Sequence, residues 1–260
     1  MTTSFEAPTR TRSSQTAVAL RAVTRRFGEL TALDGVDLSV GEGEVVALVG
    51  PSGCGKSTLL ELVAGLQRPD AGSVSVAGED AAGAGAAAFM PQRDLLLPWR
   101  DAVGNAALAL ESAGVPRREA RRRAAPLFER LGLGRFENAR PHELSGGMRQ
   151  RVAFLRTLLS GRPLLLLDEP FGALDAITRT SMQDWFAAAL QAEPRTVLLV
   201  THDVTEALLL ADRVVVLSPR PGRVADELSV ELPRPRVRRE LVGDPLFAQL
   251  ERRALEALGC

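Results

Sequence analysis

Gly50-Pro51-Ser52-Gly53-Cys54-Gly55-Lys56-Ser57-Thr58 separates the apolar run at residues 45–49 from a second apolar run at residues 59–64. This order predicts a strand, a glycine-rich turn and a helix, the context that a phosphate-binding loop requires. Glycines let successive backbone N–H groups point inward, and the helix N-terminus adds partial positive charge. We therefore predict that residues 50–58 bind a triphosphate, with Lys56 on the β- and γ-phosphates and the Ser57 hydroxyl holding Mg²⁺. The alternative is a glycine turn without a ligand.

The choice of residue at position 56 supports this prediction. Among the 32 lysine and arginine residues, Lys56 is the only lysine. A coding bias toward arginine accounts for the other positions but does not account for this one. Because lysine is a compact charge on a flexible stem and arginine a bulky planar fork, a narrow phosphate cradle favours lysine.

Composition limits the class of protein. The 260 residues allow one large domain or two small ones, and 45% hydrophobic content suffices for a core. A formal net charge of zero argues against nucleic-acid binding through a general basic field. Cys54 and Cys260 are too few for a disulfide framework, which favours a reducing, cytosolic setting. We find no apolar run of about 18 residues and no signal peptide, so we expect a soluble chain that reaches membranes only through a partner.

The N-terminal part of the chain predicts a hairpin. Residues 1–16 lack apolar periodicity, and we expect a flexible tail. Residues 17–23 and 36–40 alternate as strands do, with a turn expected at residues 25–28. Further along we expect a strand at 73–77, a loop or hairpin tip over the Gly/Ala run at 81–88, and a buried strand ending near Gln92.

A helical pattern interrupts the strands from residue 101 to residue 133. We interpret it as part of an inserted helical subdomain at about residues 93–161. Arg117 to Arg123 form a dense basic face, and without interleaved aromatic residues a solvated helix surface is favoured over a nucleic-acid patch.

Alternating strands and helices resume near residue 162. We expect strands at 164–167, 196–200 and 214–217, and helices at 176–192 and 204–210. Apolar strands that alternate with helices predict a mostly parallel sheet covered on both faces. After Arg234-Pro235-Arg236, a final helix presents Phe247, Leu250, Ala254 and Leu258 on one face, which we expect to dock on its own domain.

Two carboxylates follow the apolar strand at residues 164–167. Asp168 is placed to hold Mg²⁺, and Glu169 to activate an attacking water as general base. Taken alone, four leucines followed by an acid would favour a core strand and a turn. The phosphate loop makes the nucleotide interpretation the stronger one.

Leu144-Ser145-Gly146-Gly147-Met148-Arg149-Gln150 resembles the signature motif of ATP-binding cassette (ABC) ATPases. A serine and two glycines before a helix expected near Met148 offer a hydroxyl and backbone N–H groups to a γ-phosphate. A helix cap with a glycine turn is the alternative. The order of the other motifs in the chain favours the family.

The other motifs also resemble those of the family. Gln92 resembles the Q-loop glutamine, which senses Mg²⁺ and the lytic water, and Asp175 resembles the D-loop aspartate that crosses to the other subunit. His202 resembles the switch histidine at the γ-phosphate. Phe27 resembles the aromatic residue that stacks on adenine, although core packing is an alternative.

The resemblance covers residues 17 to about 230 and implies an α/β fold with a P-loop NTPase (RecA-like) core, an N-terminal antiparallel β subdomain and an inserted helical subdomain. Residues 231–260 would form a C-terminal extension with a short helix. ATP and Mg²⁺ are the implied cofactors. The implied assembly is a head-to-tail homodimer in which each ATP meets Lys56, Ser57, Gln92, Asp168, Glu169 and His202 of one copy and Ser145, Gly146, Gly147 and Asp175 of the other.

The resemblance further implies that ATP-driven dimer closure powers a membrane permease at the cytoplasmic face of the membrane. A periplasmic or lipoprotein solute-binding protein would be an indirect partner, and no nucleic acid is expected. The segment from Met90 to Trp99 and the run Pro219-Arg220-Pro221-Gly222-Arg223 are similar to those of nitrate, sulfonate and taurine importers and of related pyrimidine-precursor ATPases. The segment from Phe171 to Thr178 favours the latter.

Two other functions stay open at this point. A soluble ABC ATPase acting on DNA or ribosomes would carry a long coiled coil or two cassettes, and a non-hydrolysing ATP-binding module would lack Glu169 or His202. Trp99 either receives the permease or packs within the helical subdomain. The thiol of Cys54, next to a helix N-terminus and Lys56, is predicted to be reactive.

Overall fold

The computed structural model describes residues 15–241 and 243–259. Its strands are β1 (Thr16–Phe27), β2 (Leu30–Gly41), β3 (Val45–Val49), β4 (Ala71–Val76), β5 (Glu79–Asp80), β6 (Ala87–Met90), β7 (Leu164–Asp168), β8 (Thr196–Val200), β9 (Arg213–Leu217) and β10 (Val224–Ser229). Its α-helices are α1 (Lys56–Val63), α2 (Ala81–Ala84), α3 (Ala102–Ala106), α4 (Leu108–Ser112), α5 (Arg117–Arg130), α6 (Gly146–Leu158), α7 (Ala176–Ala192), α8 (Val204–Leu210), α9 (Arg238–Leu241) and α10 (Pro245–Leu258). Residues 1–14, most of the predicted flexible tail, lie outside this range.

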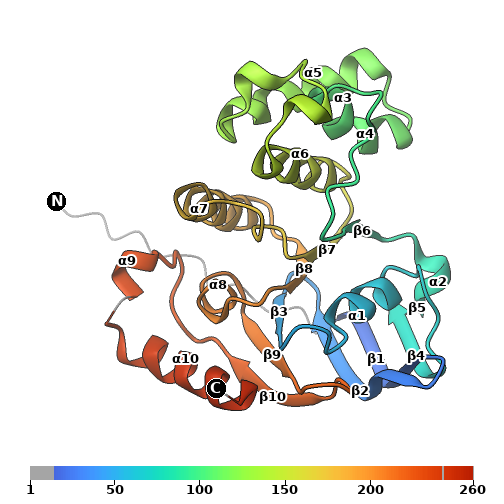
Figure 1. The fold of residues 1–260 in the computed structure, drawn as a ribbon, viewed down its shortest axis with the longest axis vertical. Helices are drawn as coiled ribbons and strands as arrows, with labels where there is room; N and C mark the ends of the chain where they lie inside the picture. The colour runs from blue at the N-terminus through green and yellow to red at the C-terminus, as the bar shows by residue number, and fades with distance from the viewer. Residues whose placement is uncertain (1–14, 242, 260) are drawn as a thin grey trace.

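Two sheets organise the described chain (Figure 1). The larger has the strand order β10-β9-β3-β8-β7-β6, and its strands from β9 to β6 run parallel. Strand β10 adds an antiparallel edge. The smaller sheet, β2-β1-β4-β5, is antiparallel throughout. The predicted parallel core with an antiparallel β region is confirmed.

The parallel sheet separates two hydrophobic cores. Strands β3, β7 and β8 are buried along their whole length because both of their faces are covered. Alternate residues of β3 enter opposite cores: Val45, Ala47 and Val49 face the helices, whereas Val46 and Leu48 face α1 and the antiparallel sheet. The carboxyl ends of β3, β6, β7 and β8 consequently lie along one edge, where a ligand site is expected.

Four α-helices, α3 to α6, lie between β6 and β7 and form the upper group in Figure 1. Small alanines (Ala102, Ala120, Ala124) and the ring of Phe128 are completely buried there. Arg121 on the basic helix α5 forms a bidentate ion pair with Asp101 at 2.7 and 2.9 Å. The helical insertion is therefore present, while the domain limits at about 93 and 161 remain a prediction.

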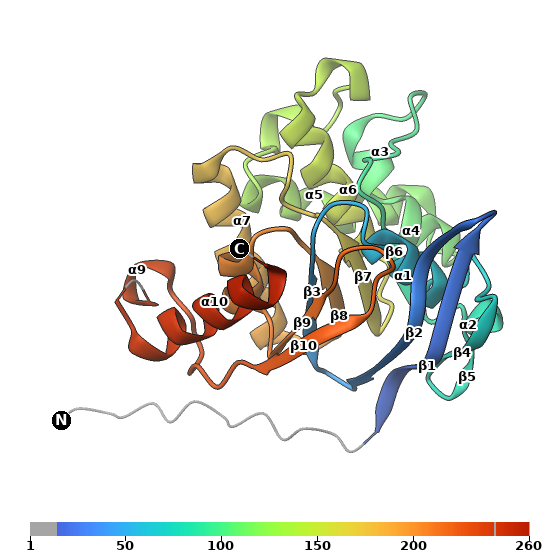
Figure 2. The ribbon, with the colours of Figure 1, turned by 60° about the horizontal axis from the view of Figure 1, so that its bottom comes forward.

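The C-terminal segment packs on the sheet domain. Phe247, Leu250 and Ala254 of α10 are buried in the core that also contains α8, and Leu258 packs against it. Two arginines join this segment to the C-terminus of α8: Arg234 donates to the carbonyl of Leu210, and buried Arg236 donates to that of Leu208, both at 2.9 Å. The expected docking of this apolar face on its own domain agrees with these contacts, and Figure 2 shows α10 beside β9 and β10.

Two local predictions were wrong, and one strand was missed. Strand β1 continues through Phe27, so the turn lies at Gly28 and Glu29 rather than at residues 25–28. The Gly/Ala run contains helix α2, because Asp80 accepts a hydrogen bond from Ala82 N and caps it. Strand β10 was not predicted, since polar residues at three of its six positions interrupt any apolar run. No helix in the described ranges is long and apolar enough to cross a membrane.

Candidate active site

The loop at residues 50–55 joins β3 to α1, as predicted, and α1 begins at Lys56. Gly55 has a φ of 105°, in the left-handed region that favours glycine. A Cβ atom there would lie 2.6 Å from Leu33 Cδ2, so residue 55 must also be glycine for β2 to approach the loop. The phosphate loop is thus packed between the parallel sheet and the antiparallel sheet.

Lys56 lies bent back over its own loop. Its side chain is 7% exposed, and its ammonium donates to the carbonyl oxygens of Gly50 at 2.7 Å and Pro51 at 3.0 Å. A buried ammonium needs such partners. These acceptors are neutral, and a phosphate would offer the ammonium oxygens that carry charge.

Asp168 ends β7 and is 4% exposed. Burial raises the pKa of its carboxyl above the ordinary value, and a hydrogen bond from the Ser57 hydroxyl opposes part of the rise. Ser57 and Asp168 therefore offer two hard oxygen donors beside the phosphate loop. Mg²⁺ in nucleotide sites uses one or two carboxylates together with substrate phosphates, so this donor set fits that ion. The described residues contain no group of three or more His, Cys, Asp or Glu that would form a metal cage.

Glu169 lies between two other predicted catalytic residues. Its Oε2 accepts a hydrogen bond from Gln92 Nε2 at 3.2 Å, and its Oε1 is 3.4 Å from His202 Nδ1. These three residues follow β6, β7 and β8, whose carboxyl ends meet at the same edge. The structure therefore brings together residues that are far apart in the sequence.

The backbone of Glu169 has a φ of 46°, a costly conformation for a residue other than glycine. Its N–H donates to the carbonyl of Val200 at 2.9 Å, and its carbonyl accepts hydrogen bonds from Gly172 N at 3.1 Å and Gln150 Nε2 at 3.4 Å. Strand β8, helix α6 and Gly172 of the turn itself thus hold the backbone that aims this carboxylate. Gln150, which is buried, was not predicted as part of the site.

The signature segment, residues 145–147, lies at the start of α6. Ser145 caps the helix by accepting a hydrogen bond from Met148 N at 3.2 Å. A Cβ on Gly147 would lie 3.2 Å from Leu174 Cδ2, so this segment packs against the segment that leads to α7. Asp175 caps α7 through Thr178 N at 3.0 Å, and hydrogen bonds from Thr178 lower the pKa of its carboxyl. Within the described residues, no hydrogen bond or ion pair joins residues 145–147 to the phosphate loop.

Phe27 lies at the end of β1 and is 44% exposed, so core packing is not its role. The guanidinium of Arg25 lies 4.8 Å from its ring centroid, a cation–π contact. The ring offers open aromatic surface, and adenine stacking stays a prediction.

Cys54 corrects one prediction. Its side chain is 1% exposed and belongs to the core between the sheets, with Sγ 3.8 Å from Lys56 Nζ. A buried thiol reacts slowly with solvent reagents. The expectation of a reactive cysteine was therefore wrong, because position 54 points its side chain into the core.

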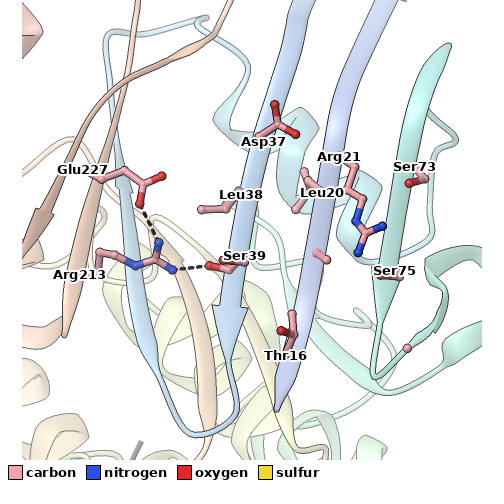
Figure 3. A pocket seen from close by; sticks show the side chains of 12 residues that line it. Thr16, Leu20, Arg21, Asp37, Leu38, Ser39, Ser73, Ser75, Arg213 and Glu227 are labelled. Atoms are coloured by element: carbon pink, nitrogen blue, oxygen red, sulfur yellow. Dashed lines mark hydrogen bonds and ion pairs between the residues drawn. The ribbon is translucent and has the colours of Figure 1, made fainter. Parts of the chain in front are cut away.

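A concave region of about 730 Å³ lies away from the site, between the antiparallel sheet and the edge of the parallel sheet (Figure 3). Polar side chains line most of it, and Arg213 there pairs with Glu227 at 2.7 Å. It includes none of the predicted site residues, and the ATP site is defined instead by the phosphate loop and the carboxylates.

A phosphate loop after a central parallel strand, with an acidic pair at the end of a nearby strand, defines the P-loop class of nucleotide-hydrolysing enzymes. The family model described as ABC transporter matches residues 33–172. The chain belongs to the ABC transporter family.

Several relatives are similar over nearly their full length. The taurine import ATP-binding protein TauB of Burkholderia pseudomallei is 44% identical over 90% of this chain and 92% of its own. The aliphatic sulfonates import ATP-binding protein SsuB 1 of Pseudomonas syringae is 46% identical over 92% and 94%, respectively. A solved dimeric ATP-binding cassette in a post-hydrolysis state with ADP and phosphate is 31% identical and matches 83% of this chain and 100% of its own, with a TM-score of 0.75.

Proposed function

We propose that this chain is the ATP-hydrolysing subunit of an importer for small sulfonates such as taurine. The observation that carries the enzymatic part is the position of Glu169, held between Gln92 and His202 and directly after buried Asp168. The solute class is the one for which the taurine and aliphatic sulfonate relatives are named. The pyrimidine-precursor alternative has no counterpart among those relatives.

The residues divide the chemistry of hydrolysis among them. Backbone N–H groups of residues 50–58 cradle the phosphates, and Lys56 turns its ammonium from the loop carbonyls to the β- and γ-phosphates. Glu169 orients the attacking water and accepts its proton, while His202 holds the carboxylate from the opposite side to Gln92. Phe27 stacks on adenine.

Ser57, Asp168 and Gln92 would hold Mg²⁺. When bound, the ion neutralises phosphate charge and helps fix the phosphates in line for attack. The raised pKa of Asp168 agrees with this role, because a nearby cation would offset the cost of its buried negative charge.

A second copy of the chain completes the site. Ser145, Gly146 and Gly147 lie at a helix N-terminus, which suits a γ-phosphate, yet they face no phosphate loop of their own chain. Asp175, at the neighbouring N-cap, would cross the same interface. The dimeric state of the structural relative supports this arrangement. ATP then closes the pair and hydrolysis reopens it.

The permease contact is proposed at an apolar pair beside Gln92. Leu95 and Trp99 are 60% and 70% exposed, so Trp99 does not pack within the helices. Arg156 fixes this segment by donating to the carbonyls of Asp94 at 2.8 Å and Leu95 at 2.9 Å. Exposed apolar side chains on a fixed backbone suit a partner. This contact would hold the chain at the cytoplasmic face of the membrane, with a solute-binding protein as an indirect partner.

The proposal is tested by deleting the gene and supplying taurine or an alkanesulfonate as sole sulfur source. Wild-type chain should restore growth, and the Glu169→Gln variant should not. Growth of the deletion strain on sulfate is the control for general fitness. If the deletion strain grows normally on sulfonates and instead needs added thiamine, the pyrimidine-precursor alternative replaces the sulfonate one.

A further inference from the structure

Arg220 in the loop between β9 and β10 contacts the phosphate loop from outside. Its Nε and Nη2 both donate to the carbonyl oxygen of Gly53, at 2.9 and 2.7 Å. The two residues are 167 positions apart in the sequence. The guanidinium occupies the space beside Gly53 so closely that a Cβ there would lie 2.7 Å from Nη2.

This contact fixes the orientation of one peptide unit. In a trans peptide the C=O and the following N–H point in opposite directions. With the Gly53 carbonyl held by Arg220, the N–H of Cys54 points across the loop, where it donates to the carbonyl of Pro51 at a long 3.3 Å. Phosphate loops bind the α- and β-phosphates with such inward N–H groups. Arg220 thus fixes a peptide unit whose N–H lies inside the phosphate-binding segment and has only a long hydrogen bond of its own.

The backbone that carries Arg220 is itself fixed to both neighbours. Gly222 N donates to the carbonyl of Ala32 at 2.9 Å, and the Gly222 carbonyl accepts from Asp34 N at 3.1 Å. A Cβ on Gly222 would lie 2.1 Å from the Cys54 carbonyl oxygen, so the two backbones touch. Ser218 Oγ closes the turn through the carbonyl of Pro221 at 3.1 Å. The Arg220 loop, residues 218–223, is therefore a support between β2 and the phosphate loop.

We infer that Arg220 is a positioning residue for nucleotide binding: it holds the Gly53–Cys54 peptide of the phosphate loop in its phosphate-accepting orientation and adds positive charge beside the cradle. This inference rests on the proposed ATP binding. It concerns the α- and β-phosphates, which ATP and ADP share, and it assigns Arg220 no part in attack on the γ-phosphate.

The test measures dissociation constants for ATP and for ADP by calorimetry, together with KM and kcat, on full-length variants. Arg220→Ala should weaken ATP and ADP binding equally, by about three- to tenfold, the range for an exposed charge-assisted contact with a single carbonyl. KM should rise in parallel while kcat stays within about twofold. Arg220→Lys, which keeps the charge and one donor, should recover part of the affinity.

Arg223→Ala is the matched control. Arg223 lies on the same loop, is exposed and pairs with Asp34, and among the described residues it makes no hydrogen bond or ion pair with the phosphate loop. Its removal should leave both dissociation constants unchanged. Equal loss in Arg223→Ala and Arg220→Ala would show general loosening of the loop and overturn the inference. Loss of kcat with unchanged affinity in Arg220→Ala would overturn it as well, and so would normal binding by that variant. If the wild-type chain fails to bind ATP, the proposed function itself fails.

Discussion

The phosphate loop and the signature segment are both glycine-rich helix N-termini, but the chain treats them differently. The phosphate loop is enclosed: β2 packs on Gly55, Arg220 holds the Gly53 carbonyl, and Lys56 and Asp168 beside it are buried. The signature segment is held more lightly: Met148 N caps it through Ser145, Arg151 Nε donates to the Gly147 carbonyl at 3.4 Å, and Gly147 packs against Leu174.

The two regions therefore differ in what fixes their conformation. The backbone of the phosphate loop is arranged by its own chain before any nucleotide binds, so binding requires Lys56 to turn but little rearrangement of the backbone. The signature segment exposes its N–H groups and depends on a second molecule for a ligand. Affinity for ATP should therefore depend mainly on the first region, and turnover on both.

The largest expected effect is that of Glu169→Gln. The amide keeps the size of the side chain and removes its ability to accept a proton, so turnover should fall by at least about 100-fold. ATP binding should persist, and an ATP-stabilised dimer should accumulate in gel filtration. A Glu169→Gln chain that hydrolyses ATP at the wild-type rate would remove Glu169 as the base.

Mixing two variants that are each inactive tests directly whether two copies of the chain build each ATP site together. Lys56→Ala disables the phosphate loop, and Gly146→Asp disables the signature segment. A Cβ atom at residue 146 would meet only Arg149 Nη2, at 3.8 Å, so the aspartate is sterically tolerated. Each variant alone should be inactive. In a head-to-tail dimer, an equal mixture should recover about a quarter of the wild-type rate, because half of the dimers are mixed and each has one intact site. No recovery would argue that each copy completes its own site.

A smaller effect is expected at His202. Removing the partner of Glu169 Oε1 in His202→Ala should lower kcat by roughly 10- to 100-fold and leave the ATP dissociation constant unchanged. The chain provides a matched control in His142→Ala, since His142 is its second histidine and lies in the exposed turn before the signature segment. Comparable losses in both variants would contradict a specific role for His202.

The smallest effect concerns stability at Asp168. Because burial raises its pKa in the folded chain, the folded state binds this proton more tightly than the unfolded state does. The carboxylate therefore lowers stability above the folded pKa, and this cost disappears as pH falls through the folded pKa toward the ordinary aspartate value. Nucleotide-free Asp168→Asn should have a higher Tm than wild type at neutral pH, and the difference should shrink on acidification. Mg²⁺ with ATP should raise the Tm of wild type more than that of the variant. A pH-independent difference in Tm would assign the effect to packing instead.

Much of the fold could be predicted because its signals are local. Strands β3, β7 and β8 are continuous apolar runs, and helices α7 and α8 follow them after short turns, so each can be recognised within one segment. Strand β10 has no such signal, since its position depends on pairing with β9. The hairpin turn was misplaced because Arg25 and Arg26 are polar residues within a strand, where tertiary pairing overrides pattern.

The same limit applies to the site. Motifs of consecutive residues located the phosphate loop and the acidic pair. The distance from Glu169 to Gln92 and His202 depends on how three strands align. Contacts such as Arg220 with Gly53 join distant residues and leave no periodic trace in the sequence. Cys54 was misjudged because its neighbours in sequence suggest reactivity, whereas its burial is set by β2 and β9 packing around the loop.

The solitary lysine has a consequence for measurement. A lysine-specific protease has a single cleavage point in this chain, the bond between Lys56 and Ser57 in the first turn of α1. Since Lys56 is buried, native cleavage requires this region to open, and its rate follows the opening equilibrium when closing is fast. The appearance of two fragments, residues 1–56 and 57–260, therefore provides a label-free record of how often the phosphate loop opens and of how far each nucleotide keeps it closed.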